Sequence, residues 1–290
     1  GWSQCDYGED FTEDVDVICD GLDNDCDGLA DEDADVLLEP ETGDAASDGR
    51  DNNCNGLVDE PGGVMVPVPT VAGLWIDVYE ATVFEHPDCT GARYGLDVDD
   101  YQPGFPADSS VAEVELYACS LPEMVPSGYL SWHRARRACE AQGKSLCSLT
   151  GWQTACRGDM HAQWPYGSHF VPGTCNDPVG GEGRAAQAGA YVECVSGPGV
   201  YDMSGNLAEW IQDWDDGHPG NALTAGFGYQ CELCSFSEDC TPCDPGQLSQ
   251  DETRLIEWGT DCIPGPSRVE SLPRDMLKPY LGVRCCYRPE

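Results

Sequence analysis

Apolar and polar residues alternate along one stretch of the chain. In residues 74–84, LWIDVYEATVF, the apolar residues Leu74, Ile76 and Val78 recur at every second position, and Ala81 extends the same face. A period of two is typical of a strand with one buried face. The pattern therefore predicts a strand over residues 74–84.

Two later segments follow helical spacing instead. Residues 131–147, SWHRARRACEAQGKSLC, offer Ser131 as an N-cap, place Ala135, Ala138 and Cys139 on one face, and reach Gly143, which ends the helix. Residues 148–159, SLTGWQTACRGD, begin a second helix in the same way. The remaining chain is rich in turn residues, with 34 Gly and 21 Pro. Two helices among short strands and long loops predict an irregular, loop-rich α+β domain rather than a doubly wound sheet.

Charge divides the chain into two parts. Residues 1–60 contain 21 Asp and Glu and one Arg, a net charge of −20 out of −39 for the whole chain. From about Val64 the composition becomes aromatic, Gly-rich and mixed polar. We therefore expect a small acidic module over residues 1–62 and a large domain over residues 63–290. So acidic a chain excludes nucleic acid as a partner, and bound divalent cations would relieve its self-repulsion.

The cysteine content indicates an oxidising compartment. The chain has 18 Cys, an even number, which favours disulfides in an extracellular or periplasmic protein. It starts at Gly1 without an apolar leader, as expected of a mature secreted chain whose signal peptide has been removed. No apolar run is long enough to span a membrane.

An acidic motif occurs twice in the first 60 residues. Residues 19–32, CDGLDNDCDGLADE, and residues 47–60, SDGRDNNCNGLVDE, agree at 9 of 14 positions. Alternate oxygen-bearing side chains before a Gly turn can wrap a hard cation. The predicted ligands are Asp23, Asp25, Asp27, Asp31 and Glu32 in the first repeat, and Asp51, Asn53, Asn55, Asp59 and Glu60 in the second.

Ligand chemistry favours Ca²⁺ over copper in these repeats, because they offer carboxylates and no His. The second repeat should bind more weakly, since Asn53 and Asn55 replace two carboxylates. The spacing resembles thrombospondin type 3 and dockerin calcium loops, and the acidic repeats of a methanotroph copper-binding protein. The alternative is a solvated acidic linker that binds ions diffusely. Cys26 and Cys54 share one position, so a bridge between them would join the repeats and leave Cys5 and Cys19 as a second pair, one of several connectivities.

Four segments of the large domain carry a family resemblance. They are residues 75–84 (WIDVYEATVF), residues 129–159 followed by WPYG, residues 199–214 (GVYDMSGNLAEWIQDW) and residues 281–286 (LGVRCC). In this order, over roughly residues 64–290, they resemble the formylglycine-generating enzyme (sulfatase-modifying factor) family. The resemblance implies a C-type-lectin-like fold with little regular secondary structure and bound calcium.

The resemblance also implies two sites. One is calcium held by Asn206, the Leu207 carbonyl and Glu209; the alternative is that Asn206 and Glu209 only orient a turn around a buried Trp210. The other is a copper site in which two cysteines bind Cu(I) and activate O₂. Cys231 falls on the first of these ligands, but the fifth residue after it is Phe236 rather than Cys. Gly228 stands where the family has a Ser, and Cys234 would have to act as the second ligand at a different spacing.

Further cysteines and acidic residues have more than one interpretation. Residues 231–243, CELCSFSEDCTPC, could form disulfides, a metal knuckle or a redox pair, with disulfides favoured by secretion. Cys285 and Cys286 are expected to pair with different partners. Residues 213–218, DWDDGH, form an acidic loop that holds a cation or is simply solvated.

Two functions follow from these features. The first is a secreted, disulfide-rich, calcium-binding extracellular protein, a non-catalytic binding or self-assembling surface module whose partner is itself or an extracellular protein or glycan. The alternative is a copper-dependent oxidase that generates formylglycine from a cysteine in a sulfatase-type peptide, with Cys231 and Cys234 as its copper ligands.

Overall fold

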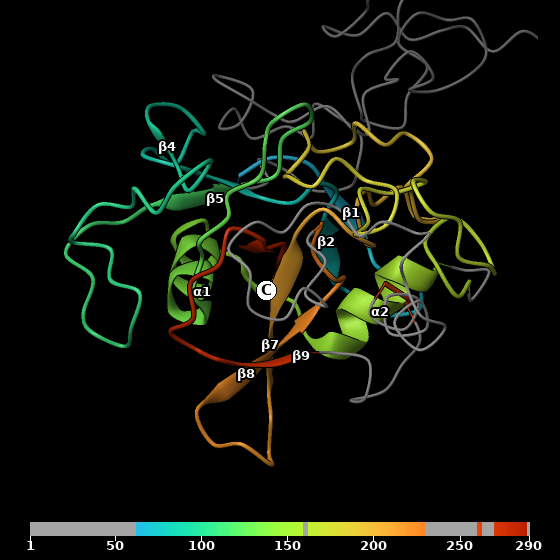
Figure 1. Cartoon of the computed structure of the whole chain (residues 1–290). Helices are drawn as coiled ribbons and strands as arrows, with labels where there is room; N and C mark the ends of the chain where they lie inside the picture. The colour runs from blue at the N-terminus through green and yellow to red at the C-terminus, as the bar shows by residue number, and fades with distance from the viewer. Residues whose placement is uncertain (1–61, 159–161, 230–259, 263–269, 289–290) are drawn as a thin grey trace, which may run out of the picture.

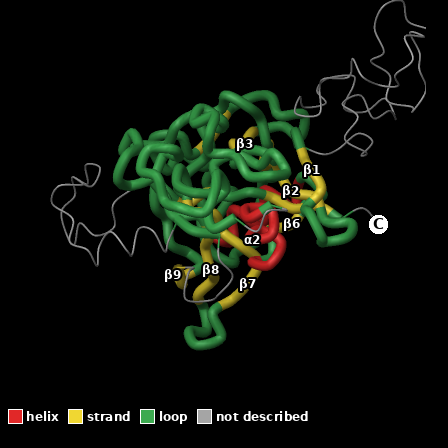
Figure 2. The backbone as a smooth tube through the Cα atoms, turned by 90° about the vertical axis from the view of Figure 1, so that its right-hand side faces the viewer, coloured by secondary structure: helices red, strands yellow, loops and turns green. Residues whose placement is uncertain are grey.

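The computed structural model describes residues 62–158, 162–229, 260–262 and 270–288 (Figure 1). The acidic repeats, Cys231 and Cys234 lie outside the described residues. Loops make up most of the described chain and surround two helices and short strands (Figure 2). The predicted loop-rich α+β class is therefore confirmed.

Both predicted helices are present, and each begins at the predicted serine. Helix α1 spans Trp132–Ala141, and the Ser131 hydroxyl accepts a hydrogen bond from the Arg134 N–H at 3.1 Å. Helix α2 spans Leu149–Arg157, and Ser148 caps it through the Gly151 N–H at 3.2 Å. These bonds satisfy N–H groups that the first helical turn leaves without partners.

The strands form three small sheets. The first has the order β1-β2-β11-β6, with β1 (Met65–Pro67), β2 (Trp75–Asp77), β11 (Cys285–Tyr287) and β6 (Ser145–Leu146), all antiparallel. The second has the order β10-β7-β8-β9, with β10 (Leu281–Gly282), β7 (Ala208–Trp214), β8 (Asn221–Ala225) and β9 (Glu270–Pro273); only the β10–β7 pair is parallel. The third is antiparallel, with β4 (Arg93–Tyr94), β3 (Thr82–Phe84) and β5 (Tyr117–Cys119) in the order β4-β3-β5.

The single strand predicted over residues 74–84 is wrong in its extent. The segment contributes β2 to the first sheet and β3 to the third, and residues 78–81 cross the core between them. Its polar residues are buried as well as its apolar ones, because they have partners. The Asp77 carboxylate lies 2.6 Å from Lys144 Nζ with both side chains fully buried, and it also accepts the Cys285 N–H at 3.0 Å.

Five disulfides join the described loops and elements. They are Cys89–Cys119, Cys139–Cys285, Cys147–Cys286, Cys156–Cys262 and Cys175–Cys194. The adjacent Cys285 and Cys286 pair with different partners, as predicted. Within the described ranges, no helix is long and apolar enough to cross a membrane.

Candidate functional site

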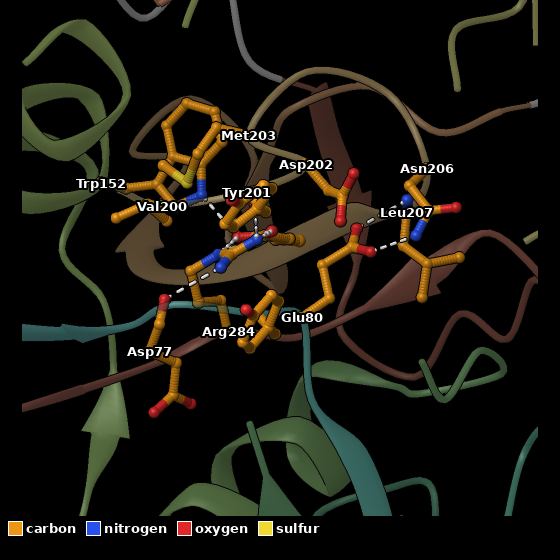
Figure 3. A network of polar contacts seen from close by, with 12 residues as sticks. Asp77, Glu80, Trp152, Val200, Tyr201, Asp202, Met203, Asn206, Leu207 and Arg284 are labelled. Carbon is orange, nitrogen blue, oxygen red and sulfur yellow. Dashed lines mark hydrogen bonds and ion pairs between the residues drawn. The ribbon is translucent and has the colours of Figure 1, made fainter. Parts of the chain in front are cut away.

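The guanidinium of Arg284 lies at the centre of a polar network in the core (Figure 3). Its Nη1 donates to the Asp77 and Val78 carbonyl oxygens at 2.9 and 2.7 Å, and its Nη2 donates to the Tyr201 carbonyl at 2.7 Å. The same group forms an ion pair with Glu209, with Nη2 3.0 Å from Oε1. Arg284 therefore joins β2, the loop before β7 and β7 itself around one charge.

Glu80 and Asn206 form the second half of this network (Figure 3). The Glu80 carboxylate accepts the Leu207 N–H at 2.8 Å and the Asn206 side-chain amide. Asn206 has a φ of +57°, a left-handed conformation that asparagine tolerates better than most residues. This conformation lets one residue present its side chain to the core and its backbone to the neighbouring loops.

Three buried carboxyl groups share the one guanidinium. Burial raises the pKa of Glu80 well above its usual range, and the neighbouring carboxylates of Asp202 and Glu209 raise it further. Burial raises the pKa of Asp202 to about 6. Burial also raises the pKa of Glu209, although the Arg284 charge opposes this shift. The network therefore retains a proton more readily than exposed carboxylates would.

A pocket of about 620 Å³ opens beside this network. We call it the Tyr229 pocket, and its lining combines apolar side chains with a few charged ones. The residues that line it are Leu96, Asp97, Val125, Tyr129, Glu182, Arg184, Ala185, Ala186, Gln187, Ala190, Tyr229 and Pro279. Its size and mixed chemistry are typical of a binding site for a small ligand or a peptide segment.

Asn206 connects the network to two walls of the pocket. Its Oδ1 accepts the Ala186 N–H at 2.8 Å, and its Nδ2 also contacts the Ala186 carbonyl oxygen at 3.4 Å. Its backbone carbonyl accepts the Tyr229 N–H at 2.8 Å. A displacement of Asn206 would therefore also displace Ala186 and Tyr229, two residues of the pocket wall.

Comparison with known families decides where this arrangement belongs. Residues 54–285 match the family model described as a sulfatase-modifying factor enzyme 1-like domain (FGE-sulfatase). The chain belongs to this family. The matched range begins inside the second acidic repeat, upstream of the predicted boundary at residue 63.

Two curated proteins of the FGE-sulfatase family show sequence similarity. The formylglycine-generating enzyme of Thermomonospora curvata is 29% identical over 101 residues, which cover 31% of this chain and 33% of that protein. The bovine (Bos taurus) inactive C-alpha-formylglycine-generating enzyme 2 is 32% identical over 95 residues, which cover 29% of this chain and 32% of that protein. The chain thus spans about a third of the length of the curated relatives it matches.

Two solved structures resemble the chain at lower sequence identity than these two relatives. PvdO from Pseudomonas aeruginosa is 14% identical with a TM-score of 0.45, over 74% of this chain and 80% of that one. Treponema denticola variable protein 1 is 11% identical with a TM-score of 0.43, over 78% and 98%.

The acidic region matches a second family model. Residues 13–32 and 33–60 each match a metal-binding motif, Cu-binding MopE. The resemblance to acidic metal-binding repeats is therefore confirmed, while the choice between Ca²⁺ and copper stays a prediction.

In the segment where the family resemblance implies calcium, the side-chain oxygens of Asn206 and Glu209 already accept hydrogen bonds from other residues of the chain. Asn206 Oδ1 accepts N–H groups from Asn176 and Ala186, both at 2.8 Å. The Glu209 carboxylate accepts the Trp152 indole N–H at 2.5 Å and faces Arg284, whose positive charge neutralises it. In the part of the chain that the structure describes, no group of three or more His, Cys, Asp or Glu side chains could hold a metal ion. Calcium at Asn206, Leu207 and Glu209 stays a prediction.

The copper site of the FGE-sulfatase family fits this chain poorly at Gly228. A Cβ atom at this position would stand 2.8 Å from the Tyr280 Cβ, closer than real Cβ contacts. A serine therefore has no room unless the backbone moves. The ten cysteines within the described ranges are all in disulfides, so of the 18 in the chain eight (18 − 10) remain outside those ranges, including Cys231 and Cys234.

Asp215 and His218 of the β7–β8 hairpin meet Ser271 of β9, but not as a catalytic triad. Asp215 lies between the other two, with its carboxylate bonded to the Ser271 hydroxyl and 2.7 Å from His218 Nδ1. A nucleophile needs the base beside it, and here the serine donates to the carboxylate instead. Residues 213–218, the acidic loop singled out in the sequence, are thus fixed by hydrogen bonds within the loop and to β9.

The sequence did not identify Glu80, Asp202 or Arg284 as parts of the site. A signal was present for Arg284, because it interrupts residues 280–287, YLGVRCCY, which carry no other charge. Buried charges of this kind require partners. Pairing them required knowledge of contacts over about 200 residues of sequence, which periodicity does not supply.

Proposed function

We propose that this FGE-sulfatase family member is a secreted, calcium-binding extracellular protein that acts as a non-catalytic binding or self-assembling module. The observation that carries the proposal is the lack of room at Gly228, where a Cβ would stand 2.8 Å from the Tyr280 Cβ. Gly228 stands where the family has the serine that shapes the oxygen site.

Tyr280 is fixed in this position by the surrounding sheet. Its side chain is buried, and its carbonyl oxygen accepts the Ala208 N–H at 2.8 Å. The next residues form β10, which pairs with β7. Because the obstructing atom is a Cβ rather than the end of a flexible chain, a rotamer change does not make room.

Disulfides support the extracellular location. Five bridges among the described residues are unusual in a reducing cytosol and common in secreted proteins. The matched metal-binding motif and the net charge of −20 over residues 1–60 support calcium in the acidic module. The Asn206 segment is a further calcium candidate on the family resemblance.

The Tyr229 pocket supports a binding role. Apolar surface from Leu96, Val125 and Pro279 lies beside the charged groups of Glu182 and Arg184. Such a pocket suits a segment of an extracellular protein or a glycan, with the Asn206 network as its rigid support.

The second candidate is a copper-dependent oxidase that generates formylglycine from a cysteine in a sulfatase-type peptide. It is favoured by Cys231, which keeps the first ligand position of the family. The name of the Thermomonospora curvata relative records the active enzyme, and that of the bovine relative records an inactive one.

One assay separates the two functions. The purified protein, loaded with copper under reducing conditions, is incubated with O₂ and a cysteine-containing sulfatase peptide, and the peptide mass is followed. We expect no conversion. Turnover that disappears in Cys231→Ala would establish the oxidase instead, and a variant with Cys240→Ala serves as the matched cysteine control.

A further inference from the structure

Two tryptophans and two arginines form a surface cluster at the start of α1. The Trp132 and Trp214 rings lie 5.3 Å apart, and the Arg274 guanidinium stands 4.5 Å from the Trp214 ring centre and 5.8 Å from that of Trp132. Arg136 lies 5.7 Å from the Trp132 ring centre. We call these four residues the Trp–Arg patch.

Hydrogen bonds from three elements fix the patch. The Trp132 indole N–H donates to the Ile211 carbonyl at 3.0 Å, and its backbone N–H donates to the Arg274 carbonyl at 3.0 Å. The Arg274 Nε donates to the Gly220 carbonyl at 3.1 Å. The patch is therefore rigid before any partner arrives, which lowers the entropy cost of binding.

The patch exposes both apolar surface and charge. Trp214 is 52% exposed and is the one aromatic among the large apolar side chains that are exposed in the described ranges. Arg136 is neutralised by Glu140 at 2.7 Å. Within the same ranges, no carboxylate forms a salt bridge with Arg274. Trp132 is buried beneath Trp214, and Arg274 is half-buried. Trp and Arg side chains dominate binding energy at many protein interfaces.

The charge distribution of the chain indicates which segment would bind the Trp–Arg patch. The chain has 14 Lys and Arg against 53 Asp and Glu, so cationic surface is scarce on this molecule. The acidic residues 1–60, with a net charge of −20, are present at the same concentration as the patch itself. A carboxylate-rich segment complements a patch that offers a guanidinium and an aromatic face.

The patch lies apart from the point where the acidic module joins the described chain. The described chain begins next to β1, in the upper part of the molecule, whereas the β7–β8 hairpin projects from its lower end in both views (Figures 1 and 2). Trp214 is the last residue of β7, at the start of this hairpin. A head-to-tail contact of this kind generates a ring where its rotation closes and an open chain where it does not, and a reciprocal exchange of modules gives a dimer.

We propose that the acidic module of one copy, residues 1–60, binds the Trp–Arg patch of a second copy, so that the protein assembles head to tail. The inference rests on the self-assembling form of the proposed function. Carboxylates of the module pair with Arg274, and the module's apolar side chains cover Trp214.

Self-association of the full chain tests the proposal. Sedimentation velocity over a concentration series in constant Ca²⁺ gives the dissociation constant, and raising NaCl from about 50 to about 500 mM should weaken it. Trp214→Ala and Arg274→Glu should each weaken it about tenfold or more. Arg288→Glu makes the same charge change at an exposed site outside the patch and should leave it unchanged.

A second variant tests the occupant. Replacing Asp33, Asp35, Glu39 and Glu41 by their amides removes four charges of the module without touching the predicted metal ligands, and should weaken association about tenfold. Circular dichroism and melting temperature check that each variant is folded.

Three results would overturn the proposal. They are a protein that stays monomeric up to about 100 µM, association that neither patch variant weakens, and association that the patch variants weaken but the amide variant does not. The last result would assign the patch to a different part of the second copy. Calcium binding and absence of oxidase turnover in a monomeric protein would leave the proposed extracellular binding role standing while this inference fails.

Discussion

Arg284 and Glu209 form an ion pair inside the core, with Nη2 3.0 Å from Oε1 and neither side chain more than 1% exposed. The same guanidinium is the nearest cation to Glu80 and Asp202, which are also buried. One positive charge thus stabilises three carboxyl groups and three backbone carbonyls.

Removing that charge should destabilise the domain strongly. Arg284→Met leaves buried carboxyl groups uncompensated and should lower the free energy of unfolding by about 3–5 kcal/mol. Urea denaturation measures the change. Arg136→Met removes an exposed pair with Glu140 on α1 and should cost less than about 1 kcal/mol. Equal effects of the two variants would contradict the role given to Arg284.

Asp202 should make stability depend on pH between about 4 and about 6. Because burial raises its pKa to about 6 in the folded state, the folded protein holds this proton when the unfolded chain has already lost it. Its contribution is therefore complete below the unfolded pKa and is lost as the pH rises through the folded one. We expect Asp202→Asn to reduce the fall in the free energy of unfolding over this range by about 2 kcal/mol.

The comparison for Asp202 is Asp216→Asn, which changes an exposed carboxylate in the hairpin. Its pH dependence should match that of the unaltered protein. If Asp202→Asn also matches it, burial does not hold a proton at this site.

Even a methyl side chain at position 228 should destabilise the protein. Gly228→Ala places a Cβ 2.8 Å from the Tyr280 Cβ and should lower the free energy of unfolding by about 1–3 kcal/mol. Gly217→Ala, where the nearest neighbour is the Asp215 side chain at 3.2 Å, should have a smaller effect. In a double-mutant cycle, Tyr280→Gly should reduce the cost of Gly228→Ala; additive effects would show that the two residues do not obstruct each other.

Chelation should lower the melting temperature if the acidic repeats hold calcium. Calorimetric titration with Ca²⁺ should give tighter binding at the first repeat than at the second, since Asn53 and Asn55 carry no charge. Asp23→Asn should therefore remove the tighter event and Asp51→Asn the weaker one. Cu²⁺ that binds the repeats in place of Ca²⁺ at equal concentrations would reverse the metal assignment.

Local signals were sufficient for some of the fold. Ser131 and Ser148 predicted both helix starts, because an N-cap depends on the three residues that follow it. Family motifs placed the large domain in the FGE-sulfatase family, which the match over residues 54–285 confirms.

Long-range contacts explain what the sequence did not reveal. The alternation at Leu74, Ile76 and Val78 predicted one strand, but Asp77 and Glu80 are drawn into the core by Lys144 and by the Asn206 segment. The segment therefore divides between two sheets. The Tyr229 pocket joins loops that are distant in sequence, so no single motif marks it.

The vicinal Cys285 and Cys286 have a consequence for the order of folding. Their bridges span 146 and 139 residues, and Arg284 beside them completes the buried charge network. Native contacts between such distant positions form slowly. The core of the domain therefore cannot be completed before residues 281–287 are synthesised. A chain shortened before them would lose the disulfide of α1 and that of Cys147, and would leave three buried acids without their cation.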